Sequence, residues 1–364
     1  MDTMFVPHLY QNNKFMQTYF LTFLLFLLLP VTSFKEKAII KSLATTPPAI
    51  SEIIQDSSRT EALPSKAKKI FQSIDNGQTW QDVSAGLPAD LLMENVFAID
   101  GEIFLHSESR VFTSNALQVP PVWKKAMLPD PKITAIYPGQ TGLFAYGFGA
   151  GFFQDMQGGG IWLPINSTFE GKAVNTFLEA RDGSIYIGSD NGIFKSVDGF
   201  KTWKQVFEGD LISSLVEANG VLMGEGVIGL VRSTDHGQHW EYINKEEGRA
   251  IKTGIINGGI AAIFIGGQGS NDHVNAYGMK NSLQASSDKG MTWQHIDNGF
   301  PSTRNIFDIE AAGAYLFCSL NTGIYRSADQ GKTWTLVYPS KEKERFEMAV
   351  SGKTVFAILV SGGC

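Results

Sequence analysis

Short runs of apolar residues recur along most of the chain, and turn-forming residues close each run. Between residues 173 and 207 these runs lie in AVNTFLEA, GSIYIGS, GIFKS and TWKQVF, which Gly or Asn-Gly separates. Runs of this length bounded by turn residues are typical of β-strands, and Gly or Asn-Gly supplies the positive φ that a tight hairpin needs. We therefore expect four consecutive antiparallel strands in this segment.

The third of these strands recurs with a fixed ending, in which an apolar or aromatic pair comes shortly before a serine. Five copies read KIFQS, GIFKS, GLVRS, SLQAS and GIYRS, and two eroded copies read RVFTS and GFFQD. The anchor positions are 73, 114, 155, 196, 233, 286 and 327, so the spacings are 41, 41, 41, 37, 53 and 41. A period near 40 residues with four strands per unit is typical of a β-propeller.

The tryptophans support the same count of repeats. There are seven in the chain, one for each copy: Trp80, Trp123, Trp162, Trp203, Trp240, Trp293 and Trp334. The repeats begin with only a third and a fourth strand at residues 69–87, and they end with only a first and a second strand at 345–361. We predict an all-β, seven-bladed β-propeller with four antiparallel strands per blade, closed by pairing these two ends, because a ring leaves no free sheet edge.

An octapeptide follows the serine in five of the repeats. It reads SIDNGQTW, SVDGFKTW, STDHGQHW, SSDKGMTW and SADQGKTW. An aspartate in a tight turn can accept N–H groups of its own loop, Gly permits a strained backbone, and Trp can fill the space between sheets. We expect a structural role, the alternative being metal or sugar binding by the carboxylates. The residues concerned are Asp75, Asp198, Asp235, Asp288 and Asp329, with Trp80, Trp203, Trp240, Trp293 and Trp334.

This octapeptide resembles the Asp-box, or BNR, repeat of the sialidase superfamily and of many other secreted propellers, over residues 69–364. The resemblance implies that the boxes lie on the outside of the ring, away from ligand sites. The chain is also similar to single-ring, seven-bladed, exported propellers of the photosystem II assembly and stability factor type. Those proteins bind protein partners without catalysis, so the resemblance implies a binding scaffold.

Composition and the N-terminus bear on location. Residues 15–34 carry no charge, and FLTFLLFLLLPV at 20–31 precedes small residues at 31 and 33. We interpret residues 1–33 as a signal peptide and 34–68 as a linker or spacer, which predicts a periplasmic or extracellular protein. The alternative is an uncleaved membrane anchor, the only membrane contact that we expect. A net charge of −6 argues against a nucleic-acid partner.

Candidate binding residues follow from where propellers usually bind, at one mouth of the central channel. Three arginines fall in connections that lead to that mouth, in consecutive repeats: Arg249, Arg304 and Arg345. Acidic residues in comparable connections are Glu94, Glu170 and Asp210. The longest spacing reflects a polar insertion at 266–281, which contains Asn271, Asp272 and His273. We expect these arginines and insertion residues to contact a protein partner or a glycan.

Catalysis is the alternative to binding. An exo-sialidase-like glycoside hydrolase would need three converging arginines, a Tyr–Glu nucleophile pair and an Asp acid, and the resemblance would bring an Arg-Ile-Pro motif that this chain lacks. Xyloglucanase-type enzymes need two propellers, and this chain has residues for one. His236 and His239 have HxxH spacing on a hairpin with no third ligand in prospect. We therefore expect no catalytic residue, no metal and no cofactor.

Overall fold

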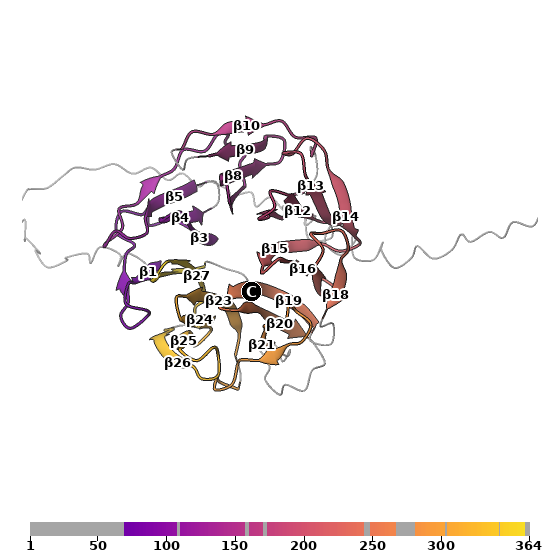
Figure 1. The fold of residues 1–364 in the computed structure, drawn as a ribbon. Coiled ribbons are helices and arrows are strands. Elements are labelled where there is room, and N and C mark those ends of the chain that lie inside the picture. Colours follow the sequence, from indigo (N-terminus) through magenta and orange to yellow (C-terminus); the bar gives the residue numbers. More distant parts are fainter. Residues whose placement is uncertain are drawn as a thin grey trace, which may run out of the picture. The chain divides into compact units, whose positions relative to one another are not determined.

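The computed structural model describes residues 69–107, 110–156, 160–169, 173–243, 248–266, 281–302, 304–341 and 343–360. These residues form seven four-stranded antiparallel sheets arranged in a ring, as Figure 1 shows. The predicted seven-bladed β-propeller is therefore confirmed. None of the described residues forms a helix long and apolar enough to cross a membrane. The interpretation of residues 1–33 and 34–68 concerns positions outside the described residues, and it stays a prediction.

Each blade is numbered here after its repeat, and its strands are given from the channel outward. Blade 1 contains β27 (Phe346–Ser351), β28 (Thr354–Leu359), β1 (Ile70–Ser73) and β2 (Gln81–Asp82). Blade 2 contains β3 (Asn95–Ile99), β4 (Glu102–Ser107), β5 (Arg110–Asn115) and β6 (Lys124–Lys125). Blade 3 contains β7 (Ala135–Gly139), β8 (Gly142–Gly147), β9 (Gly151–Asp155) and β10 (Leu163–Ile165). Blade 4 contains β11 (Thr176–Glu179), β12 (Ile185–Ser189), β13 (Gly192–Ser196) and β14 (Lys204–Glu208).

The other three blades follow the same order. Blade 5 contains β15 (Ile212–Ala218), β16 (Val221–Gly226), β17 (Leu230–Ser233) and β18 (Glu241–Ile243). Blade 6 contains β19 (Gly248–Ile256), β20 (Gly259–Gly266), β21 (Asn281–Ser286) and β22 (Gln294–His295). Blade 7 contains β23 (Ile306–Ala312), β24 (Tyr315–Leu320), β25 (Gly323–Ser327) and β26 (Thr335–Pro339).

Blade 1 closes the ring by combining the two ends of the propeller sequence. β1 pairs antiparallel with β28 from Ile70 opposite Ile358 to Ser73 opposite Val355. The sheet order is β2-β1-β28-β27, so two strands come from each end. The predicted closure between residues 69–87 and 345–361 is thus confirmed.

The hydrophobic core is divided into clusters that lie between neighbouring sheets. One cluster joins Phe144 of blade 3 to Phe177 and Ile187 of blade 4, and Phe144 and Phe177 lie 4.6 Å apart between ring centroids. The second strand of a blade is covered on both faces, and every residue of β12 and of β16 is buried. Because each sheet buries its two faces only against its two neighbours, no blade has a core of its own.

The Asp-box carboxylates are held by their own turns. In blade 6, Asp288 accepts the backbone N–H of Thr292 at 2.9 Å and its hydroxyl at 2.6 Å, and the Ser286 hydroxyl donates to it at 2.8 Å. These bonds from Thr292 and Ser286 hold the pKa of the Asp288 carboxyl at about 2. The same contacts recur around Asp75, Asp198 and Asp329, and around Asp235 with His239 in place of the threonine.

The tryptophans lie between blades, but their indole N–H groups differ in whether they have a hydrogen-bond acceptor. Three of these groups donate to a backbone carbonyl of the preceding blade: Trp123 to Val83 at 2.7 Å, Trp162 to Met127 at 2.9 Å, and Trp334 to Ile296 at 2.6 Å. In all three cases the preceding blade has a fourth strand of only two residues, and the accepting residue comes one or two residues after the end of that strand.

Three other indoles follow blades whose fourth strand is longer. The N–H groups of Trp80, Trp240 and Trp293 are buried and have no hydrogen-bond partner within the described part of the chain. The strands that precede them have five, five and three residues, and the position three residues after the neighbour's Trp still belongs to the strand. An indole therefore reaches a backbone carbonyl of the neighbouring blade only where the neighbouring strand has already ended.

We predict that Trp123→Phe destabilises the ring more than Trp240→Phe. Both changes shrink the side chain, but only Trp123→Phe leaves a buried carbonyl, that of Val83, without its donor. An unsatisfied buried acceptor costs about 1–3 kcal/mol. Urea unfolding of the two variants measures the difference, and equal losses would show that the indole hydrogen bond adds nothing.

We also predict that the Asp-box contribution is lost in acid. The Asp288 pKa lies below its usual value in the folded protein, so the stabilisation is present above about pH 4 and disappears as the pH falls through about 2. Asp288→Asn should melt below the wild type at pH 6, and the gap should close towards pH 2. Thermal melts across this range test it, with the exposed Asp100→Asn as the matched control; a gap independent of pH would contradict the prediction.

Candidate functional site at the channel mouth

Three consecutive blades carry the same irregularity at the start of their innermost strand. The pairing register shifts between Ile212 and Ser214 in β15, between Ala250 and Lys252 in β19, and between Ile306 and Asp308 in β23. A β-bulge re-aims the side chains beside it, and bulges are frequent next to active sites. Ser214, Lys252 and Asp308 therefore occupy equivalent positions on the innermost strands of blades 5, 6 and 7.

Asp308 ties three blades together at this level. Its side chain is fully buried, and one oxygen contacts the Lys252 ammonium of blade 6 at 3.0 Å. The other oxygen accepts the backbone N–H of Met348 in blade 1 at 2.7 Å, and the N–H of Ile309 donates to the carboxylate at 2.9 Å. Buried carboxylates are stable only when they are paired in this way, so Asp308 acts as a brace between neighbouring blades.

Lys252 lies among several carboxylates. Burial alone would lower the pKa of its ammonium, but the negative charges of Asp308, Glu310 and Glu347 outweigh burial and raise the pKa. Its side chain is about one third exposed, at 35%. The single ammonium is therefore shared by carboxylates from blades 7 and 1.

Glu310 is the carboxyl group of the cluster with the fewest hydrogen bonds and opposite charges to stabilise its ionised form. It stands two residues after Asp308 in β23, and the described residues give it no hydrogen bond. Burial, followed by the charge of Asp308, raises the pKa of Glu310 to about 8 although Lys252 opposes the shift. Part of the residue remains accessible to solvent. Glu310 is thus a half-buried residue of an innermost strand whose carboxyl has a raised pKa.

Glu347 and Arg345 complete the cluster from blade 1. The Arg345 guanidinium lies 2.7 Å from the Glu347 carboxylate and 5.8 Å from the centre of the Phe307 ring. Burial, with the charge of Asp308, raises the pKa of Glu347 in spite of Lys252 and Arg345. The guanidinium of Arg345 thus has an anionic and an aromatic neighbour, and its side chain is 43% exposed.

Glu225 is buried beside the same cluster and links blades 5 and 6. From β16 it accepts the backbone N–H of Thr253 and the Thr253 hydroxyl, the latter at 2.7 Å. Burial raises the pKa of its carboxyl, and the hydrogen bonds from Thr253 counteract part of that rise. Like the Asp308 carboxylate, the Glu225 carboxylate makes its hydrogen bonds to a neighbouring blade.

The structure separates the three predicted arginines. Arg345 lies at the channel mouth in the cluster described above, and Arg249 is exposed on β19. Arg304 is fully buried: its guanidinium lies 2.5 Å from Asp297 and donates to the carbonyl of Pro301 at 3.0 Å. A guanidinium buried in an ion pair cannot meet a ligand at the mouth, so the assignment of Arg304 to ligand binding is corrected to a structural role.

Three of the other residues singled out in the sequence have described contacts, and four lie outside the described residues. Asp210 is buried and accepts backbone N–H groups of Val227 and Ile228, while Glu94 lies 3.1 Å from the His106 ring. His239 contacts its own Asp-box aspartate, Asp235, at 2.6 Å. The insertion residues Asn271, Asp272 and His273, and also Glu170, lie outside the described residues, so their predicted roles stay predictions.

Sequence reasoning missed the residues that make the cluster. Lys252, Asp308, Glu310 and Glu347 all stand on innermost strands, whereas the predicted binding residues lie in the connections between strands and in the insertion. A signal was present, because IFDIEAA and FEMAVS place carboxylates inside otherwise apolar strands. Charged residues at such positions are rare unless they are paired or line a channel.

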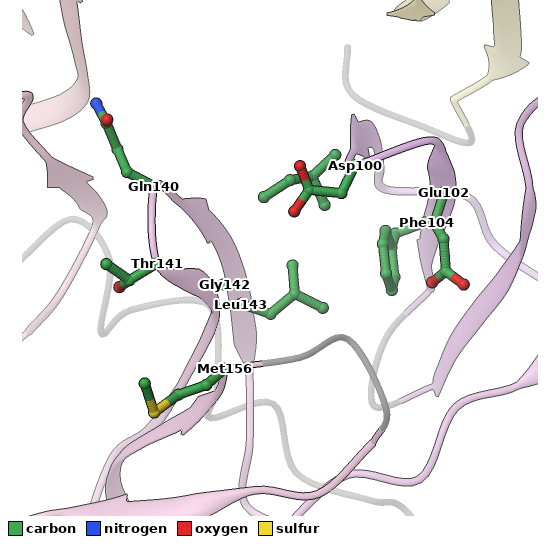
Figure 2. A pocket seen from close by; sticks show the side chains of 9 residues that line it. Asp100, Glu102, Phe104, Gln140, Thr141, Gly142, Leu143 and Met156 are labelled. Atoms are coloured by element: carbon green, nitrogen blue, oxygen red, sulfur yellow. The ribbon is translucent and has the colours of Figure 1, made fainter.

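A separate hollow of about 560 Å³ lies between blades 2 and 3, at the end of the ring where the first and second strands of each blade join. Figure 2 shows Asp100 and Gln140 on opposite walls, with Leu143 between them and Phe104 beside Glu102 on the wall of Asp100. Its Thr141 is hydrogen-bonded to Glu179 of blade 4 at 2.9 Å. The hollow has no set of converging charged groups like that around Lys252, so it is the weaker candidate for a functional site.

Comparison with known proteins gives a likeness in structure alone. No protein-family model matches the chain, and no curated protein matches it. Among solved structures, YCF48 from Cyanidioschyzon merolae is 13% identical with a TM-score of 0.54, over 75% of this chain and 97% of that one. A structure titled streptogramin B lyase is 14% identical with a TM-score of 0.53, over 80% and 98%.

An ancestral GH74 enzyme is also similar, at 14% identity and a TM-score of 0.51 over 76% of this chain. This chain spans only about two fifths of that enzyme, 41% of its length. At such identities the likeness shows the fold and no more. The expected similarity to assembly-factor propellers is confirmed at the level of fold, and since the similar structures include both enzymes and YCF48, they do not decide between catalysis and binding.

We predict that Glu310→Gln stabilises the protein increasingly as the pH rises. The Glu310 pKa is about 8 in the folded protein and about 4.5 when exposed, so the folded state binds more protons between these values and wild-type stability falls across that window. The neutral amide avoids this loss. Thermal melts from pH 5 to 8.5 should show a growing advantage for Glu310→Gln, with the exposed Glu208→Gln unchanged; a constant difference would refute the shift.

Proposed function

We propose that this chain is an exported, non-catalytic scaffold that binds a protein partner through the channel mouth formed by β15, β19, β23 and β27. The innermost strands there carry the carboxylates of Asp308, Glu310 and Glu347, and the second strand of blade 5 adds that of Glu225, against the cations of Lys252 and Arg345. A fold of this type specifies no function by itself, so the proposal depends on the chemistry of this site.

The observation that carries the proposal is the engagement of Asp308 and Glu225. Both are buried and saturated by contacts that hold neighbouring blades together. Glycoside hydrolysis needs two carboxyl groups free to face a sugar, one as acid and one as base or nucleophile. With Asp308 and Glu225 serving as braces and Glu347 paired to Arg345, Glu310 is the carboxyl most available to a ligand.

The same charges indicate the chemistry of the partner. The cluster has four carboxylates for two cations, and the high pKa of Glu310 reflects a carboxyl that lacks a cation of its own. A lysine or arginine side chain of a bound segment would lie favourably against Glu310, because an opposite charge favours the ionised form. YCF48, which is similar in fold, has been solved bound to a D1 peptide, and this supports a protein partner over a glycan.

A glycosidase is the second candidate, and one observation favours it. A carboxyl group with a pKa of about 8 beside an ionised one resembles the acid of an acid–base pair, and Arg345 on the Phe307 ring supplies a platform next to it. In that case Glu347 would have to leave Arg345 and act as the second carboxylate.

Export supports a partner outside the cytoplasm. The uncharged segment at residues 15–34 has the length and flanks of a signal peptide, and the propeller sequence begins some 35 residues later. A partner from the periplasm or the medium is therefore part of the proposal.

We predict that Glu310→Gln/Glu347→Gln weakens binding of a Lys- and Arg-containing partner peptide about tenfold or more, because the cations of the peptide lose both negative charges. Partners are captured by crosslinking in the periplasmic or secreted fraction, and peptides from them are measured by calorimetry. Asp100→Asn, at the other end of the ring, is the control and should leave affinity unchanged.

Hydrolysis is measured on the same proteins with fluorogenic sialosides and β-glucans. Turnover that disappears in Glu310→Gln would replace the scaffold by a glycosidase. Equal affinity of the wild type and the double variant for the peptides would show that the channel mouth is not the binding site.

A further inference from the structure

Exposed apolar side chains gather on blades 2 and 3. Leu117, Val119 and Val122 lie in the connection between β5 and β6 and are 69%, 44% and 53% exposed. Met127, two residues after β6, is 81% exposed, Ile161, two residues before β10, is 74% exposed, and Leu163, the first residue of β10, is 55% exposed. Single exposed apolar residues are common, but several on two adjoining blades mark an interaction surface.

Two of these side chains stand where other blades have a turn-closing residue. The position before the tryptophan is Thr in four Asp boxes and His239 in the fifth, and its side chain binds the Asp-box carboxylate. Blades 2 and 3 have Val122 and Ile161 at this position. In blade 2 the aspartate itself is replaced by the buried Ala116, so no carboxylate requires a hydroxyl there. The loss of the box has thus been accompanied by exposed apolar residues.

One hydrogen bond joins the two blades at this edge. The Trp162 indole of blade 3 donates to the carbonyl of Met127, after β6 of blade 2, at 2.9 Å, and Ile161 is the residue before Trp162. β6 lies between Val122 and Met127, and a hollow of about 470 Å³ beside it is lined by Lys125, Met127 and Pro131, among others. We call the surface made by Val122, Lys124, Lys125, Met127 and Ile161 the basic apolar rim.

The charge of this region is opposite to that of the chain. The described residues between 110 and 169 contain four basic residues, Arg110, Lys124, Lys125 and Lys132, and two acidic ones, Asp130 and Asp155. Asp155 is buried and accepts the N–H of Gly160 at 2.6 Å, and Asp130 accepts the N–H of Lys132. Lys124, Lys125 and Lys132 are exposed, whereas the whole chain carries a net charge of −6.

We propose that the basic apolar rim docks on the surface of an anionic lipid bilayer. Apolar tips enter the boundary between headgroups and acyl chains, and flanking lysines contact anionic headgroups, which is how monotopic proteins bind membranes. Lysines at the edge of β6 disfavour the addition of a protein strand there, and this favours lipid over a β-strand partner. The proposal is independent of the channel site and of the fate of residues 1–33.

The test places an environment-sensitive dye on the full-length protein at Met127→Cys, in a Cys364→Ser background; Cys318 is fully buried. The control carries the dye at Val197→Cys, an apolar residue that is 73% exposed in the Asp box of blade 4. With vesicles of phosphatidylglycerol and phosphatidylcholine, fluorescence at position 127 should shift to the blue and be quenched by brominated acyl chains. The dye at position 197 should not respond, even if residues 1–33 tether the protein.

Three variants sharpen the test. Lys124→Gln/Lys125→Gln should lower the apparent affinity for phosphatidylglycerol vesicles about fivefold or more, and high salt should have the same effect. Val122→Thr/Ile161→Thr, which restores the residue of the intact boxes, should also weaken it, while Val197→Thr should not. No shift at position 127, or an equal shift at positions 127 and 197, overturns the proposal. A shift that depends on protein concentration without vesicles would also overturn it, in favour of self-association.

Discussion

Burial of each sheet against its two neighbours is the constraint on which the whole structure depends. The apolar clusters lie between blades, as where Phe144 of blade 3 packs on Phe177 of blade 4. A sheet without a neighbour would expose one of these faces, so the array must close. Closure falls to the pairing of β1 with β28, two strands that are distant in sequence. Ring closure is therefore a non-local contact, and loop closure makes such contacts slow to form.

The same constraint explains how charges come to lie inside the channel. Glu225, Lys252 and Asp308 make contacts from one blade to another, so they reinforce the spacing that apolar packing sets. Bulges in β15, β19 and β23 turn side chains that would otherwise pack between sheets. Once these braces are formed, Glu310 is left beside an ionised neighbour with little compensation, and its raised pKa is a consequence of the packing around it.

Variation among the blades carries as much information as their repetition. Five blades keep an Asp box whose hydrogen bonds stay within one turn, so the aspartate of each box is satisfied without contacts to the rest of the protein. Blades 2 and 3 have lost it, and there the chain exposes Val122 and Ile161 beside lysines. Blades 2 and 3 thus differ from the other five at the outer edge, while the ring of seven sheets is unchanged.

The sequence by itself determined the number of blades, their strand order and the closure between the chain ends. These follow from local patterns, namely a turn that satisfies its own aspartate, glycine at hairpins and one indole per repeat, none of which needs a distant partner. The site was another matter. Arg304 had the sequence context of a loop charge, yet Asp297, seven residues away, buries it in an ion pair.

Only the tertiary structure brought Lys252, Asp308 and Glu347 together, because their blades meet at the channel and their positions depend on bulges that leave no clear trace in the repeat. Likewise, the pKa of Glu310 depends on the burial and charges around it in the folded ring. Backbone conformation depends mainly on residues that are neighbours in sequence, whereas the pKa of a side chain depends on the burial and the charges that the folded ring places around it.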